Sequence, residues 1–157
     1  MFERFVEDAR AAVMRAHDEA HALGADSVRA EHFLLALAAP EFAVASKTLH
    51  AAGLHRDGVL DALQLEQARS LALVGITDAP SPLPATASDR KRLAFASSAK
   101  IALERALRAA VARGDHRITS GHVLLGVLHA DVGTVPRALE AAGIDRVELL
   151  AAVESAL

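Results

Sequence analysis

The sequence predicts an all-α fold of eight helices, arranged as two pseudo-twofold-related four-helix repeats that pack into one compact domain. Alanine, leucine and valine supply most of the 52% hydrophobic content, whereas aromatic residues contribute only 3% and tyrosine and tryptophan are absent. Because alanine and leucine are strong helix formers and strands favour aromatic residues, this composition favours helices. Two further observations agree: apolar residues recur every three or four positions, and the chain repeats itself after 90 residues.

The repeat appears when Phe5 is written above Phe95 and the comparison continues without a gap. The most informative matches are Gly24/Gly114, His32/His122, Leu34-Leu35/Leu124-Leu125 and Gly53/Gly143. Such matches in a single register are hard to obtain by chance, even in an alanine-rich chain. We therefore expect a single domain over residues 1–157, with repeat 1 over about 2–70 and repeat 2 over about 88–157.

Each copy is expected to form four helices. In the first copy a long helix ends at Gly24 and is followed by helices over about 31–38, 42–52 and 56–68. In the second copy a long helix ends at Gly114 and is followed by helices over about 121–130, 135–142 and 146–156. Glycine commonly ends a helix because it adopts the left-handed conformation without strain. Ser120 is the predicted N-cap in the second copy, whereas the matched Ala30 is a poor cap.

The segment between the copies is rich in proline. Pro80, Pro82 and Pro84 exclude a helix interior, because proline lacks the backbone N–H that a helix needs. The chain over about 77–87 is therefore predicted to be an extended connector.

Charge and cysteine content exclude several kinds of function. With 17 basic and 20 acidic residues, the net charge of −3 provides no general attraction for polyanions. The run Arg90-Lys91-Arg92 is typical of a solvated surface, so no nucleic-acid partner is expected. Cysteine is absent, which excludes disulfides and thiolate chemistry. No apolar run approaches the roughly 20 residues that span a bilayer, and the N-terminus does not resemble a signal peptide. We therefore expect no membrane association and predict a cytoplasmic location.

The histidines predict neither a metal site nor a catalytic site. His17 and His21 are spaced as i and i+4, but no third ligand completes a metal site, and no cofactor is expected. His32 and His122 occupy matched positions at helix starts, without a matched acid or nucleophile. We expect their rings to bond to the backbone and to have a structural role.

Three segments carry a resemblance to a known family: Phe2-Glu3-Arg4-Phe5, Glu31-His32-Phe33-Leu34-Leu35-Ala36-Leu37, and Leu49 with Gly53. Taken together and in order, they resemble the double Clp-N motif, the N-terminal domain of Clp ATPases, most closely that of the ClpC type. The chain has no Gly-x-x-x-x-Gly-Lys-Ser/Thr phosphate loop, so it lacks the ATPase rings that the family attaches to this domain. It is interpreted either as an excised N-domain or as a stand-alone Clp-N protein of actinobacterial type.

The resemblance implies a non-catalytic recognition module of a Clp chaperone-protease, active in regulated proteolysis and the stress response. The implied partners are Clp ATPase or protease components, adaptor or substrate proteins and, for a regulator or decoy, cyclic peptide antibiotics of the cyclomarin type. Two alternatives stay open. A helical enzyme would require titratable groups that converge in one pocket. An oligomerisation unit would require a large exposed apolar patch.

The resemblance also implies a phosphoarginine-type site, in which a glutamate of each repeat pairs with a guanidinium and helix N-termini accept the phosphate. Glu31 matches this glutamate in the first copy. The matched residue in the second copy is Gly121, so at most one such site is expected.

A second site implied by the resemblance is a ligand groove between the copies, near the start of the chain. The family pattern of an N-terminal phenylalanine, a basic residue on the first helix and Phe-x-x-x-x-Lys-x-x-x-Glu on the fifth is met by Phe2, Arg10, Phe95, Lys100 and Glu104. Pockets with an apolar floor and a few polar groups suit ligands. Because the two copies differ at Glu31 and Gly121, we expect one asymmetric site where the copies meet.

Overall fold

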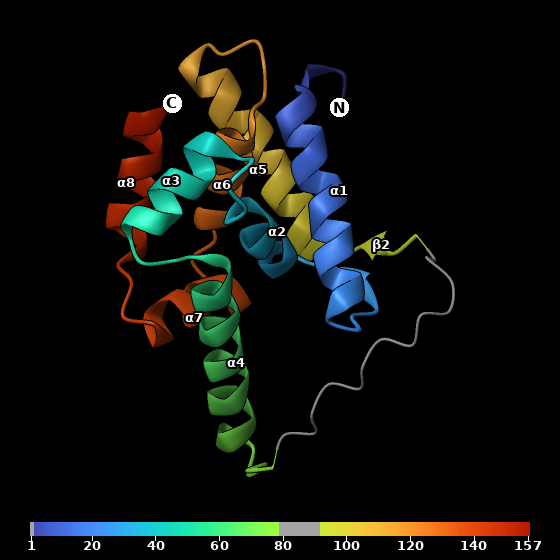
Figure 1. Cartoon of the computed structure of the whole chain (residues 1–157), viewed down its shortest axis with the longest axis vertical. Coiled ribbons are helices and arrows are strands. Elements are labelled where there is room, and N and C mark those ends of the chain that lie inside the picture. The colour runs from blue at the N-terminus through green and yellow to red at the C-terminus, as the bar shows by residue number, and fades with distance from the viewer. Residues whose placement is uncertain (1, 79–91) are drawn as a thin grey trace.

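The computed structural model describes residues 2–78 and 92–157, and most of this part of the chain is α-helical (Figure 1). In chain order the elements are η1 (Phe2–Arg4), α1 (Glu7–Ala22), β1 (Ser27–Val28), α2 (Ala30–Leu37), α3 (Ala43–Ala51), α4 (Arg56–Leu73), β2 (Ala94–Phe95), α5 (Ser97–Arg113), α6 (Ser120–Leu128), α7 (Thr134–Ala141) and α8 (Arg146–Ala156). The predicted all-α class is thereby confirmed. Apart from its first two residues, the predicted connector lies outside the described residues, as do Arg90, Lys91 and the side chain of Phe2.

The internal repeat is present in the structure. Helices α5 to α8 begin 90 or 91 residues after α1 to α4, so each helix has a counterpart in the other copy. The four glycines predicted to end helices all have positive φ angles: 66° at Gly24, 81° at Gly53, 77° at Gly114 and 72° at Gly143. This conformation suits glycine because it has no Cβ, and the predicted helix ends are confirmed.

Two predicted boundaries were wrong. Helix α4 continues to Leu73 instead of ending near residue 68, because no glycine or proline occurs between residue 68 and Gly75. The end of α4 extends away from the other helices (Figure 1). Ser120 is the first residue of α6 and not its N-cap, which is Thr119; likewise Ala30 begins α2 and its N-cap is Arg29.

Two matched histidines explain why both helices start one residue early. The Arg29 N–H donates to Nδ1 of His32 at 2.9 Å, and the Thr119 N–H donates to Nδ1 of His122 at 3.1 Å. Each ring lies in the first turn of its helix and accepts a bond from the N-cap backbone, as glutamate does in a capping box. The predicted structural role of both histidines is therefore confirmed.

The two copies exchange backbone hydrogen bonds at equivalent positions. Strand β1 pairs in parallel with β2, which brings Val28 beside Phe95, and an isolated bridge joins Phe5 to Ile118. Phe5 is the counterpart of Phe95, and Val28 is the counterpart of Ile118, so one pairing occurs twice. The start of each copy is thereby fixed to the loop that precedes the second helix of the other copy.

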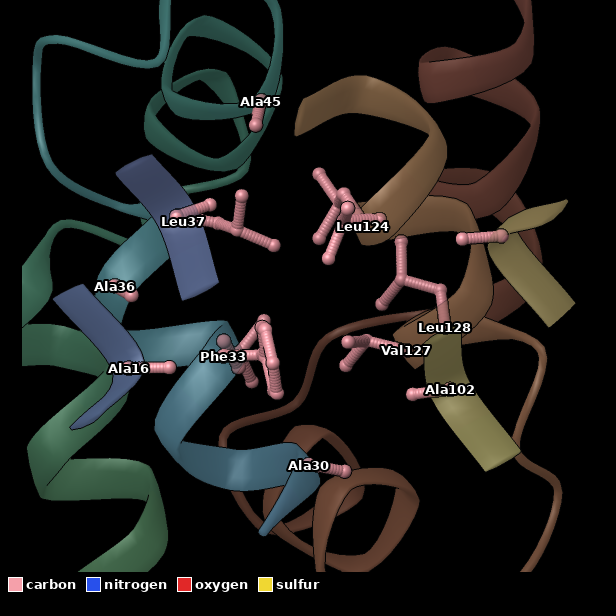
Figure 2. Close-up of a cluster of buried hydrophobic side chains, with 14 of the residues drawn as sticks. Ala16, Ala30, Phe33, Ala36, Leu37, Ala45, Ala102, Leu124, Val127 and Leu128 are labelled. Atoms are coloured by element: carbon pink, nitrogen blue, oxygen red, sulfur yellow. The ribbon is translucent and has the colours of Figure 1, made fainter. Parts of the chain in front are cut away.

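Helices α2 and α6 form the centre of the core. Every residue of α6 is buried, as are seven of the eight residues of α2. Figure 2 shows Phe33 and Leu37 of α2 facing Leu124, Val127 and Leu128 of α6. A helix that is apolar on all sides needs partners all round. Here α1 and α5 pack against the central pair, while α4 packs against α7 and α8 against α3, so each fourth helix contacts the third helix of the other copy.

Gly126 allows α5 and α6 to approach closely. A Cβ built at Gly126 would lie 2.0 Å from the Ala102 carbonyl oxygen and 2.8 Å from the Ala106 nitrogen. Both contacts are with backbone, which cannot move aside as a flexible side chain can. The counterpart in the first copy is Ala36, so the two helix pairs pack differently despite the repeat.

Candidate functional site

A pocket of ≈ 280 Å³ lies beside Glu31, and we call it the Glu31 pocket. Its walls come from the start of α2, from α5, from the end of α6 and from residues 132–137 at the start of α7. Glu31 is the second residue of α2 and is partly buried. Burial raises the pKa of its carboxyl above the ordinary value, although the positive charges of Arg29 and Arg137 act in the opposite direction. A cationic partner would therefore stabilise the charged form of this carboxylate.

Three arginines line the Glu31 pocket. Nη2 of Arg29 lies 3.0 Å from Oδ1 of Asp26, and Nε of Arg137 lies 2.8 Å from Oε1 of the buried Glu66. Arg105 of α5 is partly buried, and no ion pair or hydrogen bond joins its guanidinium to any residue that the structure describes. The pocket thus combines one carboxylate with positive charge that its own surroundings neutralise only in part.

The helix start inside the Glu31 pocket is capped by a neutral group from the other copy. The Ala30 N–H donates to the Ser98 hydroxyl of α5 at 3.2 Å. At the equivalent place in the other copy, the Ser120 N–H and hydroxyl both donate to Oδ2 of Asp8, at 3.1 and 2.7 Å. The start of α6 is therefore neutralised by Asp8, whereas the start of α2 has Glu31 in its first turn together with Arg29 and Arg137 nearby.

The position equivalent to Glu31 is closed by apolar side chains. A Cβ at Gly121 would lie 2.7 Å from Cδ2 of Leu157 and 3.2 Å from Cγ1 of Val44, so these two side chains occupy the space that a larger residue would need. At Gly121 the carboxylate is therefore lost, and Leu157 fills the space beside the backbone.

The residues of the predicted groove are only partly brought together. Phe95 is partly buried, with its ring 5.1 Å from that of His17 and 6.3 Å from that of Phe33. Lys100 and Glu104 are exposed one turn apart on α5, and Glu104 pairs with Arg108 at 3.7 Å.

The basic residue of the predicted groove lies on a different helix. Arg10 is exposed in the first half of α1. This end of α1 adjoins Ile118, which follows α5, whereas Phe95 precedes α5. A ligand that touches Arg10 as well as Phe95, Lys100 and Glu104 would have to lie along both helices.

A histidine network escaped the sequence analysis. The Nε2 atom of His122 lies 3.0 Å from Oδ2 of Asp115, and the Thr119 hydroxyl lies 3.0 Å from Nδ1. Because Nδ1 also accepts the Thr119 N–H, we place the ring proton on Nε2, where it bonds to Asp115 and lowers the pKa of that carboxyl. The first copy has Ala25 in place of Asp115, so no comparison of the copies could have revealed the contact. The ring serves as a cap.

The structure gives little support to other kinds of site. Among residues 2–78 and 92–157, no group of three or more potential metal ligands occurs, and no helix there is long and apolar enough to cross a membrane. A hollow of ≈ 390 Å³ between α3 and α8 is lined mainly by small apolar residues, and its Asp145 already caps α8. The Glu31 pocket is therefore the strongest candidate.

Comparison with known proteins identifies the family. The profile of the Clp repeat (R) N-terminal domain matches residues 4–89 and 94–157. The chain belongs to the Clp N-terminal domain family. Over 145 residues it is 31% identical to the rice chloroplastic chaperone protein ClpC1 and to a chloroplastic ClpA homologue of Brassica napus. The match covers 92% of this chain but only 14% and 15% of those relatives, so the chain corresponds to about one seventh of their length.

Solved structures confirm the Clp-N fold. The N-terminal domain of ClpD from Arabidopsis thaliana matches with a TM-score of 0.69 at 24% identity, covering 99% of this chain and 95% of that one. The Hsp104 N-terminal domain from Candida albicans matches with a TM-score of 0.66 at 16% identity, covering 96% of this chain and 89% of that one. Both likenesses concern the fold, and the predicted membership of the family is confirmed by the profile.

Proposed function

We propose that this Clp N-terminal domain is a non-catalytic docking module that binds a protein segment in the Glu31 pocket. The observation that supports the proposal most is the difference between the copies. One pocket is open and carries Glu31 and Arg105, whereas the equivalent place is closed over Gly121 by Leu157. The two copies share the same core, but only the first has a charged pocket at this position among the described residues. This difference suits recognition of one ligand.

The chemistry of the Glu31 pocket supports a phosphoarginine-type ligand. A carboxylate pairs with a guanidinium through charge-assisted and often bidentate hydrogen bonds. The start of α2 and the positive charges of Arg29 and Arg137, which act on the Glu31 carboxyl, favour an anion beside it. A phosphorylated arginine carries both groups on one side chain, and Glu31 and the surrounding positive charge would bind them together.

Binding of peptides tests this function. We expect a peptide with one phosphoarginine to bind the full chain more tightly than the same peptide with arginine. Glu31→Gln should weaken binding of the phosphoarginine peptide by roughly 10-fold or more, because a hydrogen bond to a charged group contributes about 1.5–3 kcal/mol. Glu140→Gln is the matched control, since Glu140 is exposed and does not line the Glu31 pocket. Equal affinity of the Glu31→Gln variant and the unchanged chain would contradict the assignment of the pocket.

We also propose that the residues of the predicted groove bind a second class of ligand, a cyclic peptide. The partly buried ring of Phe95 beside the exposed Lys100 and Glu104 offers an apolar contact with a polar rim, which suits a cyclic peptide of the cyclomarin type. Titration of Phe2→Ala with such a peptide tests the proposal, and unchanged affinity would contradict it. Phe95→Ala is a poorer test, because its ring also packs in the structure.

In the cell, this docking function fits a regulator or decoy of a Clp machine. We expect a pull-down from the native cytosol to recover Clp ATPase rings, adaptors or arginine-phosphorylated proteins, and recovery of none of them would contradict the role. The cytoplasmic location stays a prediction. Charged groups do converge in the Glu31 pocket, as the alternative of a helical enzyme would require. However, these groups are arginines and one carboxylate, which suit ion pairing with a ligand.

A further inference from the structure

Arg105 and its counterpart in the first copy differ in their ion pairs. Arg15, the counterpart, is held by two carboxylates: its Nε lies 3.5 Å from Glu19 and its Nη1 lies 3.3 Å from Glu41. The residue matched to Glu19 is Ala109, so the second copy lacks the buried carboxylate that holds Arg15. Arg105 is left without a partner among the described residues while lining an open pocket.

The other charges of the Glu31 pocket already have partners or act on Glu31. Arg29 is bonded to Asp26 and Arg137 to Glu66. The charges that act on the Glu31 carboxyl are those of Arg29, Arg137 and Glu66. A ligand group bound at Glu31 would therefore leave the guanidinium of Arg105 available for a second group.

Exposed aliphatic side chains line the Glu31 pocket together with Arg105. Ile101 precedes it by one helical turn and is 43% exposed, and Val132, from the loop before α7, is 80% exposed. Residues four apart lie on the same face of a helix. A partly buried cation beside exposed aliphatic groups matches a ligand with an acidic group next to an aliphatic side chain.

We infer that Arg105 reads an acidic side chain of the docked segment, an aspartate or glutamate next to the residue held at Glu31, while Ile101 and Val132 contact an aliphatic neighbour. The inference rests on the proposed function and adds sequence preference to it. Arg105 is then a specificity-determining residue that selects among segments carrying the same central residue.

Selection from a peptide library tests this inference. Each peptide carries one phosphoarginine, flanked on both sides by randomised residues, and is selected on the full chain. We expect enrichment of aspartate or glutamate at one flanking position, with an aliphatic residue beside it. Glutamate at that position should bind roughly 5- to 20-fold more tightly than glutamine, a ratio typical of a charge-assisted hydrogen bond at a partly exposed site. High salt should reduce this ratio.

Variants of α5 decide whether Arg105 is responsible. Arg105→Gln should lose the preference for glutamate, and Arg105→Glu should prefer lysine at the same position. Arg108→Gln is the matched control, because Arg108 lies on the same helix and its side chain is 78% exposed. Absence of acidic enrichment, or the same enrichment in the Arg105→Gln variant, would overturn the inference. The proposed function stays intact in that case if Glu31→Gln still weakens binding of the phosphoarginine peptide. If the unchanged chain binds no member of the library, both are wrong.

Discussion

Replacing Gly126 by alanine should force α5 away from α6. The added Cβ would lie 2.0 Å from the Ala102 oxygen, and real Cβ contacts essentially never fall under 3.0 Å, so one helix backbone must move by at least the 1.0 Å difference. Backbone shifts of this kind in a packed core cost about 1–3 kcal/mol, and two close backbone contacts place this case near the upper value. Alanine is a better helix former than glycine, which offsets about 1 kcal/mol of this loss of stability. The expected net loss of stability is about 2 kcal/mol.

Thermal and urea unfolding followed by circular dichroism measure this loss. For a chain of this size, about 2 kcal/mol corresponds to a fall in Tm of roughly 4–8 °C. Gly121→Ala is the matched control in the same helix, because its new Cβ meets mainly the flexible end of Leu157, which can rotate away. The control should unfold near the temperature of the unchanged chain. If both variants are equally stable, the close approach of α5 and α6 does not depend on Gly126 and the argument is wrong.

Three further changes test other parts of the structure. Burial lowers the pKa of His32 to about 4 from 6.5, which corresponds to about 3 kcal/mol of stability that is present above pH 6.5 and lost as the pH falls from 6.5 to about 4. His32→Gln keeps an acceptor for the Arg29 N–H, so urea unfolding of this variant should depend less on pH in that window; an unchanged dependence would refute the reasoning. Arg56→Ala should cost about 3 kcal/mol in urea unfolding, because it leaves the buried carboxylate of Glu19 without its bidentate partner at 2.9 and 2.6 Å, and a loss below about 1 kcal/mol would refute the importance of this pair. Glu31→Gln should raise the Tm at pH 7 while weakening ligand binding, because the raised pKa of Glu31 means that its charged form opposes folding above that pKa; a lower Tm would contradict this.

The sequence was sufficient to predict the repeat and most of its helices. The 90-residue register requires only comparison of the chain with itself, and glycines such as Gly24 and Gly114 end helices through local backbone geometry. The paired role of His32 and His122 could also be predicted, because each histidine bonds to backbone only three residues away. Features set by short-range geometry and confirmed by a second copy are well determined by sequence.

Contacts between distant segments could not be predicted in the same way. Asp8 accepts a hydrogen bond from the Ser120 N–H, 112 residues later, and Ser98 accepts one from the Ala30 N–H, 68 residues earlier. Nothing in the sequence around Asp8 or Ser98 indicates these distant partners. The N-cap predicted at Ser120 was wrong for a local reason, because His122 bonds to the Thr119 backbone and α6 begins one residue earlier. Leu157 follows α8 and Arg105 lies on α5, so their roles at the two positions depend on how these helices pack. Arg15 and Arg105 occupy matched positions in the two copies, so the sequence alone makes them look equivalent. Only the structure shows that Arg15 has carboxylate partners while Arg105 lines a pocket.

The number of ligands bound by each chain tests the central claim most directly. Isothermal titration with a phosphoarginine peptide, combined with amide chemical shifts from NMR, gives both the stoichiometry and the position of binding. We expect one peptide per chain, with shift changes gathered around Glu31, Ser98 and Arg105. Two equivalent sites, or changes centred on Gly121, would contradict the account of one open pocket in a repeated fold.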